Sequence, residues 1–217
     1  IRGEMNPGFG GTHPEPIGRN LGALAGAIST GMGDLGLASD GDGDRIGAMD
    51  GRGNFVDPHK IMALALRYLV EERDWRGPVV RTVSTTRMID RLAAKYNLPV
   101  YETPVGFNYI ADYMLKEDIL IGGEESGGVS FRGNIPEGDG SLMGLLLVEM
   151  VAASGTSLYE LIQSLLSEVG PAFYERNDLR LSHPVAKDRM VQLLLDDAPE
   201  RIGGESIEDM LSVDGVK

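Results

Sequence analysis

Three aspartates alternate with glycine in the run Asp40-Gly41-Asp42-Gly43-Asp44, and Arg45 follows at once. On a straight strand these three side chains would share one face but spread over roughly 13 Å, too far apart for one metal ion. Glycine at the two intervening positions lets the chain curl, so the carboxylates can converge to about 2.0–2.1 Å from one Mg²⁺. Without a cation the three acids would repel one another. The run therefore predicts a divalent-cation loop followed by an arginine that can meet a phosphate.

Short apolar segments at residues 34–38 and 46–50 flank this run, and both are short enough to be strands that hold the loop. An EF-hand is excluded, because a loop beginning at Asp40 would need glycine and glutamate where the chain has Arg45 and Gly51. A nucleophile strand of the haloacid-dehalogenase type is also open on a bare Asp-x-Asp, although Gly43 stands where threonine or valine is usual. A solvated acidic turn is the plain alternative, but it has no need of three alternating acids.

Composition excludes several classes of protein. The chain has 217 residues, 42% of them hydrophobic, which is enough for one or two domains with real cores. A net charge of −13 argues against a nucleic-acid binder or a membrane-surface binder, since both need a basic face. Cysteine is absent, the three histidines have no zinc spacing, and no apolar run approaches about 18 residues. Without a signal peptide in the sequence, we expect a cytoplasmic protein.

Apolar periodicity predicts an α/β protein with mixed, mainly parallel sheets and flanking helices. Strand-like and helix-like segments alternate between residues 79 and 122, as in βαβ units. The expected strands span residues 34–38, 46–50, 79–83, 100–103, 119–122 and 173–181. The expected helices span residues 20–28, 86–96, 107–115, 142–153, 158–169 and 185–196, with one more beginning after Asp57-Pro58. Residues beyond Gly170-Pro171 carry two elements, too few to stand alone.

A second group of polar residues follows the apolar residues 119–121. Residues 122–128 read Gly-Gly-Glu-Glu-Ser-Gly-Gly, so that two acids and a hydroxyl can accept hydrogen bonds from sugar hydroxyls. Alone, such a loop is more often a plain turn, and without a Gly-Lys-Ser/Thr ending it is not a P-loop. Ligands gather at the carboxyl ends of parallel strands, so we expect the loops at 84–86, 103–106 and 122 onward to line one site.

Both groups resemble one family. Residues 40–45 look like the metal loop of the α-D-phosphohexomutases, the phosphoglucomutase/phosphomannomutase superfamily, and residues 123–128 resemble their sugar-binding loop. Supporting segments stand in the family's order at residues 9–11, 14–16, 82–87, 102–107, 135–137 and 139–140. The resemblance covers nearly the whole chain. It implies the C-terminal part of domain 2 at residues 1–56, domain 3 at 57–170 and an incomplete start of domain 4 at 171–217, in a fragment of a longer protein.

The resemblance also implies an activity. Such enzymes interconvert hexose 1-phosphate and hexose 6-phosphate through a phosphoserine and a bisphosphorylated intermediate. The phosphoserine of domain 1 and the phosphate-binding loop late in domain 4 are not in this sequence, so we expect the isolated chain to be inactive. The Glu-x-Ser arrangement at residues 124–126 resembles the glucose/mannose branch more than the glucosamine branch.

Roles follow from the same resemblance. Asp40, Asp42 and Asp44 would hold Mg²⁺, and Arg45, the one residue expected to be catalytic, would neutralise the transferred phosphate. The expected substrate site for a hexose phosphate consists of Glu124, Ser126, Gly106 and Arg87. Of these, Glu124 and Ser126 would bind the sugar's 3- and 4-hydroxyls. For Arg87 the sequence leaves two roles open, a contact to phosphate and a structural ion pair.

Three positions depart from the family pattern. Many relatives carry lysine, histidine and lysine where this chain has Asn108, Asn134 and Gly138, which leaves the general acid/base open. A non-catalytic sugar-phosphate-binding or regulatory homologue is therefore the alternative. A calcium-binding module is a third hypothesis; against it, we expect weak, millimolar-range metal affinity, because the chain supplies only three of about six ligands.

Overall fold

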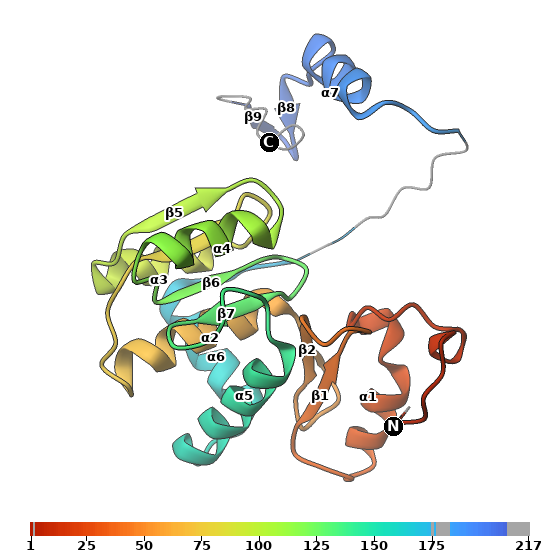
Figure 1. The fold of residues 1–217 in the computed structure, drawn as a ribbon, viewed down its shortest axis with the longest axis vertical. Helices are drawn as coiled ribbons and strands as arrows, with labels where there is room; N and C mark the ends of the chain where they lie inside the picture. The colour runs from red at the N-terminus through yellow and green to blue at the C-terminus, as the bar shows by residue number, and fades with distance from the viewer. Residues whose placement is uncertain (2, 175, 177–182, 208–217) are drawn as a thin grey trace. The chain divides into compact units, whose positions relative to one another are not determined.

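The computed structural model describes residues 1, 3–174, 176 and 183–207. It divides into two units, residues 1–173 and residues 174–217, which are described separately (Figure 1). The first unit combines two sheets with flanking helices, so the expected α/β class is confirmed.

The first sheet is a small antiparallel one. It consists of β1 (Gly36–Ser39), β2 (Ile46–Met49) and β3 (Phe55–Val56) in that spatial order, with α1 (Gly22–Ser29) beside β1 and β2. Short 3₁₀ turns at Phe9–Gly11 and Gly18–Asn20 precede them. The pairing of Ser39 with Ile46 closes the hairpin around the aspartate run, as expected from its apolar flanks. β3 was not expected, because a strand of two residues is too short to show an alternation of apolar and polar side chains.

The second sheet begins after a capped helix. In α2 (Pro58–Glu71), the Asp57 side chain accepts a hydrogen bond from the Lys60 amide at 3.1 Å, and proline occupies the first turn. The sheet order is β5 (Val100–Thr103), β4 (Val79–Thr82), β6 (Ile121–Gly123) and β7 (Val129–Phe131). The first three strands are parallel, as the alternating pattern predicts, and β7 is antiparallel.

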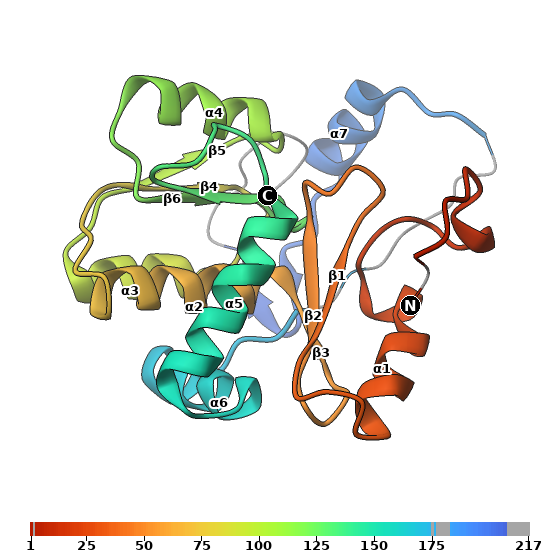
Figure 2. The same ribbon diagram turned by 60° about the horizontal axis from the view of Figure 1, so that its bottom comes forward.

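Helices cover both faces of this sheet (Figure 2). α4 (Phe107–Lys116) packs on one face through a cluster of Val80, Ile110 and Ile119. α2, α3 (Met88–Tyr96), α5 (Gly140–Ser154) and α6 (Leu158–Val169) supply most of the larger core on the other side. Among the described residues no single helix is long and apolar enough to cross a membrane. Only α5 and α6 taken together, with an angle of 88° between them, have the length and apolar composition of a membrane span. Both helices contribute buried residues to the core.

The second unit contains α7 (Lys187–Asp196) and a hairpin of β8 (Arg201–Ile202) and β9 (Glu205–Ser206). α7 matches the expected helix at 185–196. The strand expected at 173–181 falls mostly outside the described residues, which omit 175 and 177–182.

We expect Ser157→Ala to lower the free energy of unfolding by about 1 kcal/mol, because it removes the capping box that begins α6. The Ser157 hydroxyl accepts from the Glu160 amide at 3.3 Å, and the Glu160 carboxylate accepts from the Ser157 amide at 2.9 Å. The check is the denaturation midpoint in urea. Ser167→Ala, later in the same helix, is the matched control with a change within about 0.5 kcal/mol. Equal losses in both variants would contradict the capping argument.

Candidate functional site

The aspartate run forms a curled loop between β1 and β2. One carboxylate oxygen from each of Asp40, Asp42 and Asp44 lies within 4.8 Å of the other two. Gly43 adopts a φ of +84°, which favours glycine. The buried Asp40 side chain fixes the curl, since its Oδ1 accepts from the amides of Gly43 at 3.0 Å and Arg45 at 3.2 Å. The three carboxylates therefore converge as the glycine spacing predicts.

Neighbouring charges shift the pKa values of two aspartates in this loop in opposite directions. Burial alone would raise the pKa of Asp40, but hydrogen bonds from the Arg45 amide and from Arg45 Nε, at 2.6 Å, outweigh it and lower that pKa. Burial, followed by the close side-chain contact with Asp40 and by the charges of Asp40 and Asp42, raises the pKa of Asp44 to about 6. A carboxylate whose pKa is raised in this way gains most from a nearby cation.

The loop also fits a hard divalent cation by its free ligand atoms. Asp44 Oδ1 is buried and accepts no hydrogen bond from any described residue, although it lies 3.4 Å from Arg45 Nε. Carboxylate oxygens are the ligands that Mg²⁺ and Ca²⁺ prefer. The donor set therefore suits such an ion.

The glycine-rich loop after β6 presents a half-buried carboxylate. Glu124 Oε1 accepts from the Gly106 amide at 2.9 Å, and Oε2 lies 3.4 Å from the Ser126 hydroxyl. Burial raises the pKa of Glu124, opposed by these hydrogen bonds and by the charge of Arg45. The structure thus brings together Glu124, Ser126 and Gly106, three of the expected substrate-binding residues. A carboxylate and a hydroxyl side by side can accept and donate hydrogen bonds to a polyol.

Main-chain contacts join the two loops. Arg45 and Gly128 form an isolated β-bridge, and the Ile46 amide donates to the Gly127 carbonyl at 3.2 Å. A Cβ at Gly127 would lie 2.8 Å from the Ile46 carbonyl oxygen, and the residue has a φ of +106°. The cation loop and the glycine-rich loop are therefore parts of one site.

A third segment, residues 137–141 around the start of α5, completes the site. The sequence connects this segment with the family through Gly138 and its neighbours, but none of its residues was assigned to the site. The Gly140 amide donates to the Gly43 carbonyl at 2.9 Å. A Cβ at Gly138 would lie 2.7 Å from the Asp44 carbonyl oxygen, and one at Gly140 would lie 2.3 Å from that of Arg45. The signals in the sequence are the family resemblance at residues 135–137 and 139–140, the departure at Gly138, and the glycine on each side of Asp139.

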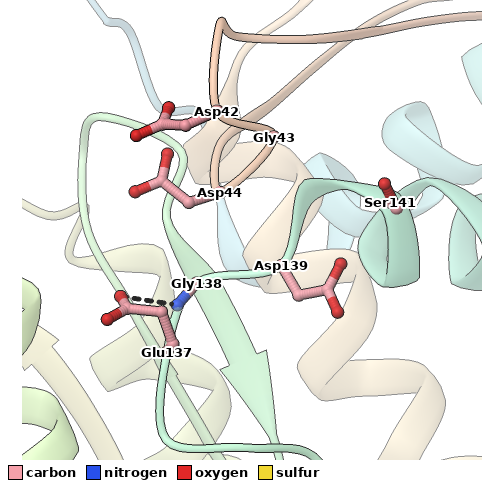
Figure 3. A pocket seen from close by; sticks show the side chains of 7 residues that line it. All are labelled: Asp42, Gly43, Asp44, Glu137, Gly138, Asp139 and Ser141. Carbon is pink, nitrogen blue, oxygen red and sulfur yellow. Dashed lines mark hydrogen bonds between the residues drawn. The ribbon is translucent and has the colours of Figure 1, made fainter.

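A hollow of about 540 Å³ lies between this segment and the cation loop (Figure 3). Its lining residues are Asp42, Gly43, Asp44, Glu137, Gly138, Asp139 and Ser141. In Figure 3 the carboxylates of Asp42, Asp44 and Glu137 point to the same side, whereas Asp139 and Ser141 point away from them. None of these described lining residues carries a positive charge, so the hollow is anionic.

The two arginines near β4 differ in role. Arg81 is buried and donates to Asp90 at 2.8 and 2.9 Å, with its Nη1 2.9 Å from Glu102. Arg87, with 61% of its side chain exposed, lies 3.5 Å from Asp90 and 3.8 Å from Glu102. Arg87 thus makes the ion pair that the sequence left open, and its phosphate contact stays a prediction.

Two positions that depart from the expected pattern have a local explanation. The Asn134 amide nitrogen lies 3.4 Å from both Ser130 Oγ and Asp139 Oδ2, so it supports the turn before α5. Gly138 has no space for a side chain, because the backbones of Asp44 and Gly128 lie against it. A lysine could not occupy position 138 without moving the cation loop.

Comparison with known proteins identifies the family. Residues 57–169, more than half of the chain, match the family described as phosphoglucomutase/phosphomannomutase, alpha/beta/alpha domain III. The chain belongs to this family, and with it to the α-D-phosphohexomutase superfamily. The division of the chain at residues 56 and 170 stays a prediction.

Several phosphohexomutases are similar to this chain. A phosphoglucosamine mutase of Bacillus velezensis is 37% identical over 158 residues, which cover 72% of this chain and 34% of that protein. Another, of Halalkalibacterium halodurans, is 31% identical over 93% of this chain and 43% of that protein. The crystal structure of a putative phosphomannomutase from Thermus thermophilus aligns with a TM-score of 0.75 and 39% identity, covering 78% of this chain and 39% of that one.

A Burkholderia thailandensis phosphoglucomutase/phosphomannomutase family protein aligns with a TM-score of 0.76 over 98% of this chain and 43% of that chain, at 22% identity, which shows the fold alone. The chain spans about a third to two fifths of the length of these relatives.

In this phosphohexomutase chain we expect Gly140→Ala to destabilise the fold by about 1–3 kcal/mol and to weaken Mg²⁺ binding, because the new Cβ would push the cation loop away. Urea denaturation and Mg²⁺ titration by calorimetry measure the two effects. Gly26→Ala in α1, whose Cβ would meet no atom within 4 Å, is the matched control and should be neutral or slightly stabilising. Unchanged metal affinity in Gly140→Ala would refute the coupling of α5 to the loop.

We expect Asp44→Asn to stabilise the metal-free chain by about 1 kcal/mol near pH 8, a reduced value because the Asp44 side chain is 40% exposed. The sign follows from linkage. Asp44 has a folded pKa of about 6, above the ordinary 3.8, so its charge costs stability above about pH 6 and costs none below about pH 3.8.

Urea unfolding in EDTA near pH 4 and pH 8, and again with saturating Mg²⁺, tests this prediction. Mg²⁺ should stabilise the wild-type chain more than Asp44→Asn, reversing their order near pH 8. If Mg²⁺ stabilises both proteins equally, the aspartate run is an ordinary acidic turn.

Proposed function

We propose that this chain is the cation-binding and sugar-binding part of a phosphohexomutase that interconverts the 1- and 6-phosphates of a hexose. The observation that carries the proposal is the main-chain junction of the two loops at Arg45 and Gly128. A cluster of three carboxylates with a fixed arginine, joined directly to a polyol-binding carboxylate, suits a sugar that carries a phosphate. Family membership supports the same reaction class.

Asp40, Asp42 and Asp44 would hold the metal ion, for which Mg²⁺ is our proposal. When bound, Mg²⁺ supplies positive charge at the oxygens of a transferring phosphoryl group. The chain's own contribution is Arg45, which Asp40 holds through Nε at 2.6 Å, with Glu15 3.8 Å from its Nη1. This arginine is thus oriented before substrate binds, which favours electrostatic stabilisation of the transition state.

The glycine-rich loop would orient the sugar. Glu124 and Ser126 lie where they can bind two neighbouring hydroxyls, and we assign them to the 3- and 4-hydroxyls. These two hydroxyls are presented similarly when the hexose turns end over end, so one loop can serve both orientations of a bisphosphorylated intermediate. The phosphoserine donor and a loop for the second phosphate are parts of the proposal that rest on the family resemblance alone.

The sugar is proposed only at the level of a hexose phosphate. Curated relatives are named phosphoglucosamine mutases, whereas the Thermus relative is named a putative phosphomannomutase. The preference for glucose or mannose expected from the Glu-x-Ser pattern therefore stays a prediction, with glucosamine phosphate to be compared directly.

The test uses the complete gene product that contains this chain, assayed with the 1-phosphates of glucose, mannose and glucosamine in the presence and absence of Mg²⁺. We expect conversion to the 6-phosphate with at least one sugar, and an Asp42→Asn loss of about 100-fold or more in kcat. Asp34→Asn, an exposed aspartate just before β1, is the matched control and should keep full activity.

Two results would count against the proposal. Binding of sugar phosphates without turnover of any of them would favour the non-catalytic homologue. Sub-micromolar Ca²⁺ affinity of this chain in calorimetry would favour a calcium-binding module.

A further inference from the structure

We propose that Glu137 is the general base of the phosphoryl-transfer step, accepting the proton of the sugar hydroxyl that is phosphorylated. This inference rests on the proposed function and names a residue to which neither the sequence pattern nor the comparisons give a role. It starts from a chemical need: a hydroxyl that attacks phosphorus loses its proton, and a positioned carboxylate can take that proton.

Elimination within the hollow leads to this residue. Its lining contains four carboxylates, those of Asp42, Asp44, Glu137 and Asp139. The first two converge with Asp40 into the cation cluster. Asp139 caps α5, because its Oδ1 accepts from the Leu142 amide at 2.8 Å, and its carboxylate points away from the cluster in Figure 3. Among the lining residues that the structure describes, only Glu137 is left with a carboxylate facing the same side as the cluster.

The backbone around Glu137 is fixed on both sides. Its amide donates to the Ile135 carbonyl at 2.8 Å, and its Oε1 accepts from the Gly138 amide at 3.0 Å. Gly138 and Gly140 are packed against the cation loop too closely for any side chain. The carboxylate is therefore held beside the cation loop before substrate binds, as a base must be to act without reorganisation.

The same packing places Glu137 near the glycine-rich loop. A Cβ at Gly138 would lie 3.1 Å from the Gly128 Cα, and a Cβ at Gly128 would lie 3.4 Å from Glu124 Oε2. A hexose bound through Glu124 would thus lie beside the segment that carries Glu137, whose side chain is exposed to solvent and to an incoming ligand.

The step balances without a further reactant. The sugar hydroxyl oxygen forms the new bond to phosphorus as the bond between phosphorus and the oxygen of the donor phosphate ester breaks. The electron pair of the broken bond stays with the donor oxygen, and the hydroxyl proton moves to the Glu137 carboxylate. In the reverse transfer, protonated Glu137 returns the proton to the sugar oxygen.

The test compares Glu137→Gln, Glu137→Asp and the control Glu72→Gln in the complete gene product with Mg²⁺. Glu72 is exposed at the end of α2, and its replacement removes the same charge and should leave activity unchanged. We expect Glu137→Gln to lower kcat by about 10²–10⁴-fold. Glu137→Asp, which keeps a carboxylate, should recover part of the rate. Mg²⁺ affinity and the denaturation midpoint should match the wild type.

Each other outcome overturns the assignment in a distinguishable way. Glu137→Gln with wild-type kcat excludes a general base while leaving the mutase function intact. A loss of Mg²⁺ affinity of about tenfold or more makes Glu137 a ligand of the cation site. Absence of turnover in the wild-type protein with all three sugars removes the proposed function and this inference together.

Discussion

The site depends on close main-chain packing of the glycine-rich loop and the start of α5 against the cation loop, which is distant from both in sequence. Gly127 lies against the backbone of Ile46, Gly138 against that of Asp44, and Gly140 against that of Arg45. Contacts this short leave no space for a Cβ, so glycine at these positions is required by packing as much as by backbone torsion. Main-chain hydrogen bonds then set the distance between the cation loop, the glycine-rich loop and α5. This main-chain packing therefore determines where the side chains of the site lie.

The cation loop contains negative charge that the rest of the protein does not fully compensate. Asp40 is compensated by Arg45 and by two amides, whereas Asp44 is left with a raised pKa and a buried oxygen without a hydrogen bond among the described residues. A fold selected only for stability would replace Asp44 by a neutral residue. Unrelieved charge of this kind is what gives a cation site its affinity, so stability is lower until the ion binds.

Sequence reasoning succeeded where one local rule sufficed. Alternation of apolar segments predicts the parallel strands β4, β5 and β6, and Asp57-Pro58 marks the start of α2. The convergence of the three aspartates was expected from the glycine spacing, but the two amide hydrogen bonds to Asp40 Oδ1 that fix the curl were not. β3 and β7 were missed because strands of two or three residues are too short to show an alternation of apolar and polar side chains. The hollow was missed because it forms between segments nearly 100 residues apart, and that packing has no local signature.

The departures from the family pattern become coherent once the packing at Gly138 is considered. A lysine at this position would need space that the backbones of Asp44 and Gly128 occupy. The absence of a lysine ammonium group at position 138 and the close packing of the cation loop are therefore one structural change. That docking also fixes the neighbouring Glu137 on the side of the cluster. A carboxylate is a stronger proton acceptor near neutral pH than a protonated lysine, but it adds negative charge to an anionic hollow. In the proposed reaction, the metal ion and Arg45 would therefore have to offset more negative charge than in a site that carries its own lysine.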